Sequence, residues 1–268
     1  MYITAAHGES SIPALRQLIR DNALGILTTG VPSDTHAFLQ SSHIPFVLDV
    51  ADESSDSELG TLRGHMARQN PQSKAIIDAL QAKAAAAPAA QPADGPAPPG
   101  VLEQEVLVLF TAAPHHYITP KWYTATKPAT GKVVPTWNYA AAQVYGRLKV
   151  YYDSKSPESV AFLDRALRSL TDQCEGSVMG YSTDGKDSSK EKSWEVDDAP
   201  EPYVRLKQKN IIGIEIEITR LEGKFKMSQE SVAGDVKGVA EGLGKFATPV
   251  SKEVGGLVCS RNKEKLQA

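Results

Sequence analysis

The sequence predicts a mainly β protein (α+β in class), most simply a β-barrel with peripheral helices. Three observations favour this fold class: many short strand-like runs bounded by turn residues, few amphipathic helical segments, and no regular alternation of strand with helix. A chain of 268 residues that is 41% hydrophobic has enough apolar side chains for a real core. Because βαβ alternation is missing, the pattern favours a barrel over a doubly wound parallel sheet.

The predicted elements begin with a short helix, capped by Ser10 or Ser11 and carrying Pro13 in its first turn. Pro71 opens a second helix that continues to about residue 80. Between the two helices, turn residues bound a series of hydrophobic runs, which are predicted to be strands at 25–29, 37–40, 44–50 and 61–67.

Two segments interrupt the pattern of strands and helices. Residues 82–100 consist of Ala, Pro and Gly at 16 of 19 positions, a composition that offers no pattern to a core. We expect this segment to be disordered or weakly ordered, either as a linker between two domains or as an insertion within one. Residues 176–192 are rich in Ser, Asp, Lys and Gly and are predicted to form a polar loop. Apart from these insertions, residues 1–242 are predicted to form a single domain, followed by a C-terminal tail at 243–268.

After the first insertion, further strand-like runs are followed by helices. A helix is predicted from Pro157, since Val160, Leu163 and Leu167 recur on one helical face. Strands are predicted at 106–112, 117–122, 132–139 and 143–152, and another helix at 200–209.

The last predicted elements form a hairpin and a helix. Ile occupies every second position from 212 to 218, a pattern typical of a half-buried strand. A partner strand is predicted at 220–227, with Glu222 and Gly223 as the hairpin turn. From Val232 onwards we expect a short amphipathic helix that ends in disorder.

Composition and charge argue against several classes of protein. A net charge of -3 and a pI near 6.1 leave no basic footprint for nucleic acid, and no helix-turn-helix pattern is visible, so direct DNA binding is disfavoured. Cys174 and Cys259 are far apart and are predicted to be free thiols in a reducing compartment. The sequence contains neither a signal peptide pattern nor an apolar run of membrane-spanning length. A cytoplasmic location is expected, with the nucleus left open.

Residues 131–139 (GKVVPTWNY) carry the densest set of polar and aromatic side chains in the chain. A core strand would be mostly Val, Ile and Leu, so this mixture indicates the wall of a site for a planar, polar ligand. Pro135 donates no ladder hydrogen bond and indicates an edge or irregular strand position. Taken singly, Lys132 is more often a solvated lysine, and Trp137 is more often a core side chain.

A second candidate cluster is Arg63, Gly64 and His65 on a predicted strand. Arg suits bidentate binding of phosphate, and the glycine beside it permits close approach of the backbone. An exposed arginine at a barrel rim is the simpler interpretation of Arg63 alone.

A third candidate segment is 223–229 (GKFKMSQ), which is either a site wall or only a polar strand end. The six histidines have no metal-site spacing, so no metal is predicted. GxSxG, P-loop and GxGxxG motifs are missing, which argues against hydrolase, NTPase and Rossmann functions.

Together these motifs resemble the PaiB-type FMN-binding proteins of the flavin split-barrel superfamily, a family that carries the label of negative transcriptional regulators. The similarity covers most of residues 1–242 outside the two insertions, and the order of the motifs is specific. The matching stretches are residues 42–45 (SHIP), 61–71 (TLRGHMARQNP), 117–123 (YITPKWY), 131–139, Trp194 with 196–200 (VDDAP), and 212–215 (IGIE) continuing to 220–224 (RLEGK).

The resemblance implies a six-stranded split barrel that forms a homodimer with FMN at the subunit interface. It implies that Arg63 and Lys132 bind the FMN phosphate, and that Thr136, Trp137 and Asn138 approach the ribityl chain or the isoalloxazine ring. The full set of residues expected to bind the cofactor is Arg63, Gly64, His65, Lys132, Val133, Val134, Thr136, Trp137, Asn138, Lys226, Ser228 and Gln229.

The chain departs from the family pattern at two further points. Cys174 stands where the family commonly has histidine, and Glu230-Ser231 replaces a usual Asn-Arg pair. Any cofactor or ligand contact made by the family at these positions is therefore in question here.

Three functions follow as hypotheses. The first is a flavin-dependent oxidoreductase with a nicotinamide electron donor, in which FMN carries the chemistry and no catalytic residue is assigned. The second is a non-catalytic transcriptional regulator, as the family label suggests. The third is a haem-binding or haem-degrading protein, suggested by relatives in the superfamily and by the spare histidines.

Overall fold

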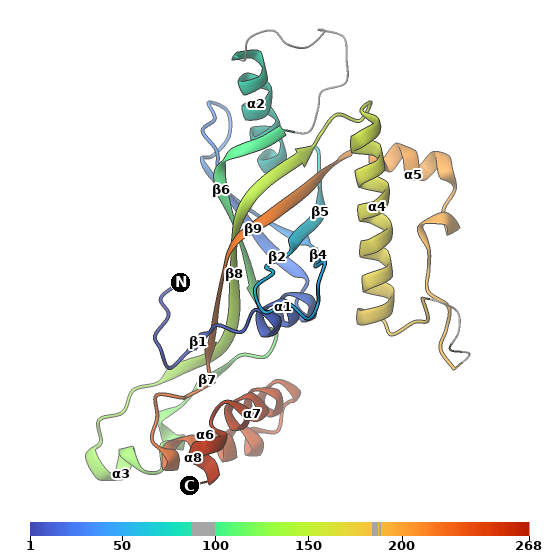
Figure 1. Ribbon diagram of the computed structural model, residues 1–268. Coiled ribbons are helices and arrows are strands. Elements are labelled where there is room, and N and C mark those ends of the chain that lie inside the picture. Colours follow the sequence, from blue (N-terminus) through green and yellow to red (C-terminus); the bar gives the residue numbers. More distant parts are fainter. Residues whose placement is uncertain (87–99, 184–186, 188, 268) are drawn as a thin grey trace. The chain divides into compact units, whose positions relative to one another are not determined.

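The structure is a computed structural model that describes residues 1–86, 100–183, 187 and 189–267. The chain forms two compact units (Figure 1). We call residues 23–109 with 144–220 the barrel unit, and residues 1–22, 110–143 and 221–268 the terminal unit. The long strands β8 (Thr136–Tyr151) and β9 (Ile211–Lys226) each contribute one part to each unit.

A β-sheet forms the centre of the barrel unit. Hydrogen bonding connects the strands in the order β3-β2-β6-β8-β9-β5-β4, and the pairs β2–β3, β2–β6, β4–β5 and β5–β9 are antiparallel. Besides β8 and β9, the strands are β2 (Leu24–Gly30), β3 (Leu39–Pro45), β4 (Val47–Asp49), β5 (Thr61–Ala67) and β6 (Gly100–Thr111).

The sheet closes on itself because β3 and β4 are consecutive in the chain. Only Phe46 separates them, so one bent run pairs with β2 in its first part and with β5 in its last part. The buried Phe46 donates its amide to the Ala23 carbonyl at 2.9 Å. Counted with β3 and β4 as one strand, the described residues form a six-stranded barrel, as the sequence resemblance implies. The predicted mainly β fold with peripheral helices is confirmed.

The alternation of residue types along these strands builds the core of the barrel unit. Side chains at every second position are apolar and point into the barrel, away from water. Burial of this apolar surface is the main favourable contribution to the free energy of folding. The buried residues include Leu27, Leu62, Met66, Val108, Leu148, Ile212, Ile214 and Ile216.

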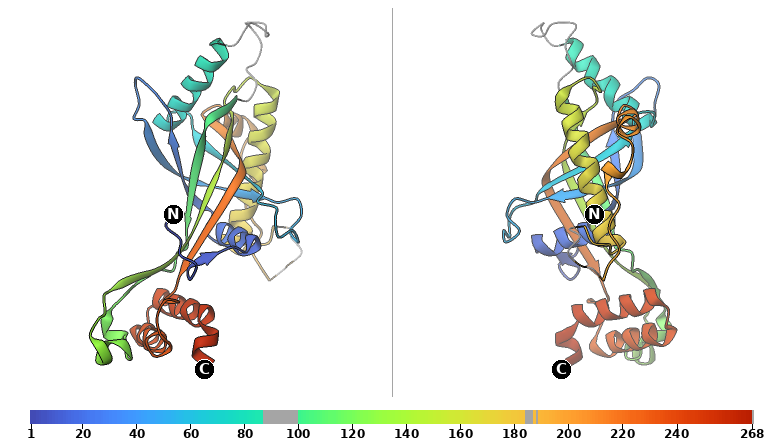
Figure 2. Two further views of the ribbon diagram at one scale, coloured as in Figure 1. Left: turned by 60° about the vertical axis from the view of Figure 1, so that its left-hand side comes forward. Right: turned by 90° about the vertical axis from the view of Figure 1, so that its right-hand side faces the viewer.

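Among its described residues, the barrel unit contains the α-helices α2 (Pro71–Ala86), α4 (Pro157–Gln173) and α5 (Glu201–Gln208). Helix α4 lies along one side of the barrel in the views of Figures 1 and 2 and contacts β4 and β5. Its Phe162 stacks on Tyr151 of β8, with ring centroids 3.8 Å apart. Two short turns follow α4, namely the π-helical η2 (Cys174–Val178) and the 3-10 turn η3 (Val196–Asp198).

The terminal unit combines short strands with helices. Strand β1 (Gly8–Glu9) pairs with the end of β9, and β7 (His116–Ile118) pairs with the start of β8. Ser11 caps the first helix by accepting the Ala14 amide at 3.3 Å. The helical elements are α1 (Ile12–Asp21), η1 (Pro120–Trp122), α3 (Thr126–Thr130), α6 (Ala233–Phe246), α7 (Pro249–Arg261) and α8 (Lys263–Gln267).

The predicted C-terminal hairpin is wrong. Strand β9 continues without a turn from Ile211 to Lys226, and Gly223 pairs with Glu9 of β1. A Cβ atom on Gly223 would lie 2.0 Å from Cδ2 of Leu15, so the glycine allows α1 to pack closely on the strand. Close packing, rather than turn geometry, therefore explains the glycine.

Several strand boundaries also differ from the prediction. The strand expected at 117–122 ends at Ile118, because Pro120 begins η1. The strand expected at 132–139 begins only at Thr136, after Pro135, and it is continuous with the one expected at 143–152. Helix α3 was not predicted at all.

The predicted insertions and tail differ in part. Residues 82–86 are helical and Gly100 begins β6, so the disorder or weak order expected for 82–100 does not hold at these positions, while 87–99 lie outside the described residues. Residues 176–178 belong to η2, and positions 184–186 and 188 of the predicted loop also lie outside the described residues. The tail does not end in disorder, since α6, α7 and α8 continue to Gln267.

Candidate functional site

The polar segment 131–139 lies in the terminal unit, where it leads from α3 into β8. Gly131 ends α3 with a left-handed φ of +66°, and an irregular stretch then carries Lys132 and Val134 at the surface. Trp137 is 48% exposed and packs edge-on against Tyr117 of β7, with ring centroids 6.2 Å apart. Its indole also donates to Nδ1 of His115 at 3.2 Å. An aromatic surface therefore lies beside the polar groups.

Lys226 joins the end of β9 to this segment. Its ammonium group donates to the hydroxyl of Thr136 and, at 3.2 Å, to the carbonyl of Trp137. The side chain is only 17% exposed. Two of the segments predicted to form one site, 131–139 and 223–229, are thus in contact within the terminal unit.

A buried amide and hydroxyl form the next layer of this cluster. Asn138 donates its side-chain amide to Oγ of Ser228 at 3.0 Å, and both residues are almost fully buried. Ser228 has a φ of +63°, a left-handed conformation that is uncommon for a residue other than glycine. Gln229 accepts the Met227 amide and donates to the Phe225 carbonyl, both at 2.6 Å. Ser228 and Gln229, predicted to lie at the end of a hairpin strand, therefore lie in an ordered loop that follows β9.

Glu230 and His7 complete the cluster, and neither was predicted to belong to it. The His7 ring is buried, and its Nε2 lies 2.8 Å from Oε2 of Glu230. The other Glu230 oxygen lies 3.6 Å from the Lys226 ammonium. The only sequence signal was the departure from the family pattern at Glu230, since nothing local connects it with a histidine 223 positions away.

The Glu230 carboxyl has a lowered pKa. Burial opposes its ionisation, but the hydrogen bond with His7, the backbone hydrogen bond and the charge of Lys226 outweigh burial and hold the pKa below its ordinary value of 4.5. A lowered folded-state pKa stabilises the fold above the unfolded-state pKa, and this contribution is lost as the pH falls through the folded-state value.

Replacing Glu230 by Gln is expected to reduce the acid sensitivity of the fold. The wild type should lose stability as the pH falls below about 4.5, and the Gln variant should lose less because no carboxylate is left to protonate. Urea unfolding between about pH 6 and pH 3 measures this effect. If the wild type and the Gln variant gave parallel curves of unfolding free energy against pH, the stabilising role of the Glu230 carboxylate would be contradicted.

The other predicted cluster, Arg63 with Gly64 and His65, lies on β5 in the barrel unit. The Arg63 guanidinium is buried and makes two hydrogen bonds to Asp49, at 2.7 and 2.9 Å. A third guanidinium bond reaches Oγ of Ser169 on α4 at 3.3 Å. A phosphate approaching Arg63 would therefore compete with the Asp49 carboxylate. Phosphate binding by Arg63 stays a prediction. In the structure, the Arg63 guanidinium forms an ion pair with Asp49.

Gly64 and His65 also have structural surroundings. A Cβ atom on Gly64 would lie 3.1 Å from the Pro45 carbonyl and 3.2 Å from Ile44, so the glycine accommodates the bend between β3 and β4. Burial lowers the pKa of His65 and favours the neutral ring. Its buried Nδ1 has no hydrogen-bond partner among the described residues, so it is a polar group that a ligand could satisfy.

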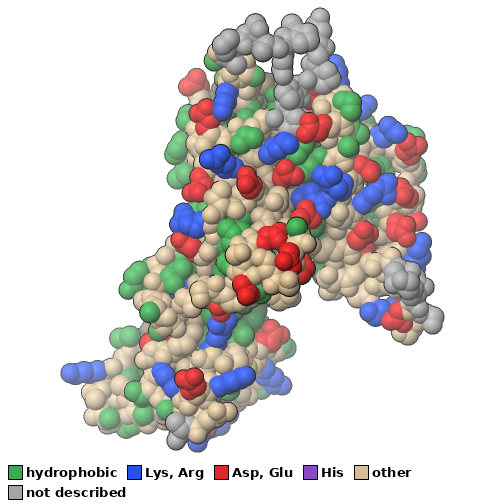
Figure 3. All heavy atoms as spheres, in the orientation of Figure 1, with side chains coloured by type: hydrophobic (Ala, Val, Ile, Leu, Met, Phe, Trp, Pro, Cys, Tyr) green, Lys and Arg blue, Asp and Glu red, His purple; other side chains and the backbone are tan. Residues whose placement is uncertain are grey.

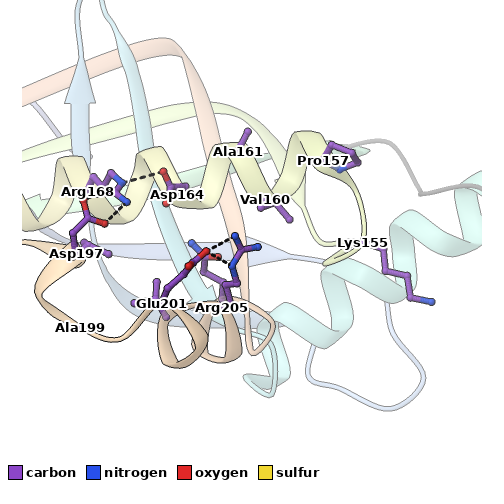
Figure 4. A pocket seen from close by; sticks show the side chains of 13 residues that line it. Lys155, Pro157, Val160, Ala161, Asp164, Arg168, Asp197, Ala199, Glu201 and Arg205 are labelled. Carbon is purple, nitrogen blue, oxygen red and sulfur yellow. Dashed lines mark hydrogen bonds and ion pairs between the residues drawn. The ribbon is translucent and has the colours of Figure 1, made fainter.

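A cavity of about 800 Å³ lies elsewhere in the barrel unit, between α4 and the segment formed by η3 and α5 (Figure 4). Arg168 pairs with Asp164 and Asp197 at 3.0 and 2.7 Å, and Arg205 pairs with Glu201. The described residues that line it include none of those predicted to bind the cofactor. Because most of its charges are paired within the walls, we assign no ligand to this cavity.

The barrel unit is thus a closed six-stranded β-barrel, and the terminal unit carries an aromatic ring, a lysine and a buried amide–hydroxyl pair close together. The chain belongs to the family described as "Putative FMN-binding domain", whose model matches residues 1–220. The resemblance stated from the sequence is therefore confirmed. The family match supports flavin and gives no support to haem.

One relative among known proteins aligns with nearly the whole chain, and a second aligns with part of it. An uncharacterized protein of Emericella nidulans is 52% identical over 267 residues, which cover 99% of both chains. The protease synthase and sporulation protein PAI 2 of Bacillus subtilis is 24% identical over 163 residues, covering 61% of this chain and 66% of the relative.

A solved structure also aligns with most of the chain. It is a pyridoxamine 5'-phosphate oxidase-related, FMN-binding protein from Nostoc punctiforme, with 10% identity and a TM-score of 0.35 over 83% of this chain and 86% of the other. At this TM-score we base no argument on the likeness. Among the helices in the described ranges, none combines the length and apolar character needed to cross a membrane.

Proposed function

We propose that this protein binds FMN and acts as a flavin-dependent oxidoreductase, as a homodimer with FMN at the subunit interface. The observation that carries the proposal is the family match over residues 1–220, supported by the contact between segments 131–139 and 223–229. FMN, when bound, supplies reversible one- and two-electron chemistry. The protein residues bind and orient the flavin and limit its contact with water.

Lys226, Thr136 and Trp137 form a cluster that suits the ring of FMN. The exposed face of Trp137 is available to a planar ring system, while Lys226 and Thr136 offer a cation and a hydroxyl to the polar edge of that ring. Since Glu230 lies 3.6 Å from Lys226, a doubly charged phosphate at this point would be repelled by a carboxylate. Within this proposal, Lys226 therefore contacts the ring rather than the phosphate.

Lys132 is the better of the two predicted phosphate ligands. It is exposed, whereas Arg63 is buried and already bonded to Asp49. A lysine at the surface can reach an anion without losing an existing ion pair.

The test is an absorbance spectrum of the purified protein, followed by titration with FMN. The wild type is expected to take up FMN and to show a flavin spectrum, and NADH or NADPH is expected to bleach it. Lys132→Ala should weaken binding, since a charge-assisted contact contributes about 1.5–3 kcal/mol. A colourless protein that takes up no FMN would exclude the proposed function.

The regulator hypothesis is less well supported. The relative from Bacillus subtilis carries a name that refers to sporulation and protease synthesis. On the face of the molecule seen in Figure 3, however, Lys and Arg side chains lie among Asp and Glu, so this face has no continuous basic surface for a phosphate backbone. A sequence-specific gel shift at physiological salt would reverse this preference.

A further inference from the structure

The C-terminal helices carry polar side chains that reach the loop containing Ser228 and Gln229. Helices α6, α7 and α8 follow the residues matched by the family model, which end at 220. They belong to the terminal unit, as does the loop. In the views of Figures 1 and 2 these helices lie together as one group.

The loop at 227–231 follows the end of β9, so its carbonyl groups lie beyond the strand. Ser228 is in a left-handed conformation, which turns the chain sharply after β9. Backbone carbonyls in such a turn need side-chain or solvent partners, because they lie outside helix and sheet ladders.

Two residues at the C-terminus provide those partners. Asn262 is buried and donates its side-chain amide to the Met227 carbonyl at 3.0 Å. Lys265 donates its ammonium group to the carbonyls of Gln229 at 2.5 Å and Ser231 at 2.8 Å. Three carbonyls of a five-residue loop are thus bound by side chains of Asn262 and Lys265, which hold the loop on both sides of Ser228.

Further contacts fix the helices that carry Asn262 and Lys265. Arg261 forms an ion pair with Glu9 at 2.6 Å and lies over the ring of Phe225, 3.9 Å from its centroid. Val254 and Val258 of α7 are fully buried. The donors of the clamp are therefore anchored independently of the loop.

We propose that α7 and α8 act as a clamp that holds the loop at 227–231 in its cofactor-binding conformation, with Asn262 and Lys265 as positioning residues. This inference rests on the proposed FMN binding, because the loop carries Ser228 and Gln229, which are predicted to bind the cofactor. Preorganising the loop removes an ordering cost that FMN binding would otherwise meet, so the clamp raises affinity without touching the ligand.

The experiment compares Lys265→Met with the control Lys263→Met, an exposed lysine two residues earlier on the same helix. Lys265→Met is expected to raise the dissociation constant of FMN about tenfold, and to speed amide hydrogen exchange at 228–231 in the FMN-free protein about tenfold. Lys263→Met should change neither quantity. Global unfolding by urea should be nearly the same in all three proteins.

The two measurements separate the clamp from the cofactor. If Lys265→Met binds FMN as tightly as the wild type, or if loop exchange is unchanged, the clamp is overturned while FMN binding stands. If the wild type takes up no FMN, the proposed function and the clamp's effect on the flavin both fall. In that case, unchanged exchange in Lys265→Met would also rule out the clamp itself.

Discussion

Replacing Lys226 by Met is expected to weaken FMN binding by about tenfold to a hundredfold, because a hydrogen bond to a charged group contributes about 1.5–3 kcal/mol. The ammonium group is the only cation that contacts Thr136 and the Trp137 carbonyl among the described residues, and its side chain is largely buried. Fluorescence titration with FMN measures the loss. Urea unfolding of the FMN-free proteins is measured beside it, because the variant also loses the hydrogen bonds of Lys226 to Thr136 and to the Trp137 carbonyl, and some loss of stability is expected.

Two further variants test whether the charge and the position of Lys226 account for the loss of affinity. Lys226→Arg keeps the charge and should recover part of the affinity. Lys127→Met removes an exposed lysine of α3 and should bind FMN like the wild type. Equal affinities of Lys226→Met and the wild type would remove Lys226 from the site.

Replacing Gly146 by Ala is expected to destabilise the barrel unit by about 1–3 kcal/mol, which is the range for overpacked cores. A Cβ atom at this position of β8 would lie 2.3 Å from the carbonyl oxygen of Glu217 and 2.7 Å from Cγ2 of Ile216. A backbone oxygen in a neighbouring strand cannot rotate away, so the two strands must separate. Urea unfolding gives the free energy directly.

Gly244→Ala is the matched control for this change. It lies inside α6, and a Cβ atom there would have no neighbour within 4 Å. Alanine is favoured over glycine inside a helix, so this variant should be neutral or slightly more stable. If both variants unfold at the same denaturant concentration, the close approach of β8 and β9 is not real.

Strand and helix positions with strong local patterns were predictable. Alternating isoleucines from 212 to 218 marked the buried part of β9, and the spacing of Val160, Leu163 and Leu167 marked α4. Glu222-Gly223 was misread because glycine serves both turns and close packing, and only Leu15 distinguishes the two. Local sequence does not show which side chain of another element packs against a given glycine.

Some residues of the candidate site were also identified from the sequence, and others only from the structure. Trp137, Asn138, Lys226 and Ser228 were identified from their residue types and from the family resemblance, and the structure brings them into contact. Glu230 was noticed only as a departure from the family pattern, and its partner His7 was not noticed. Their contact depends on the N-terminal strand β1 pairing with the end of β9.

By itself, the sequence determined the mainly β fold class, the family and the segments that carry polar and aromatic groups, because these follow from periodicity and motif order. Only the tertiary structure decided which of those groups meet: Lys226 with Thr136, Glu230 with His7, and the C-terminal Lys265 with the carbonyls of the Ser228 loop. These contacts join residues 34 to 223 positions apart. Such pairings arise from packing of the whole chain, since no local propensity favours one distant partner over another.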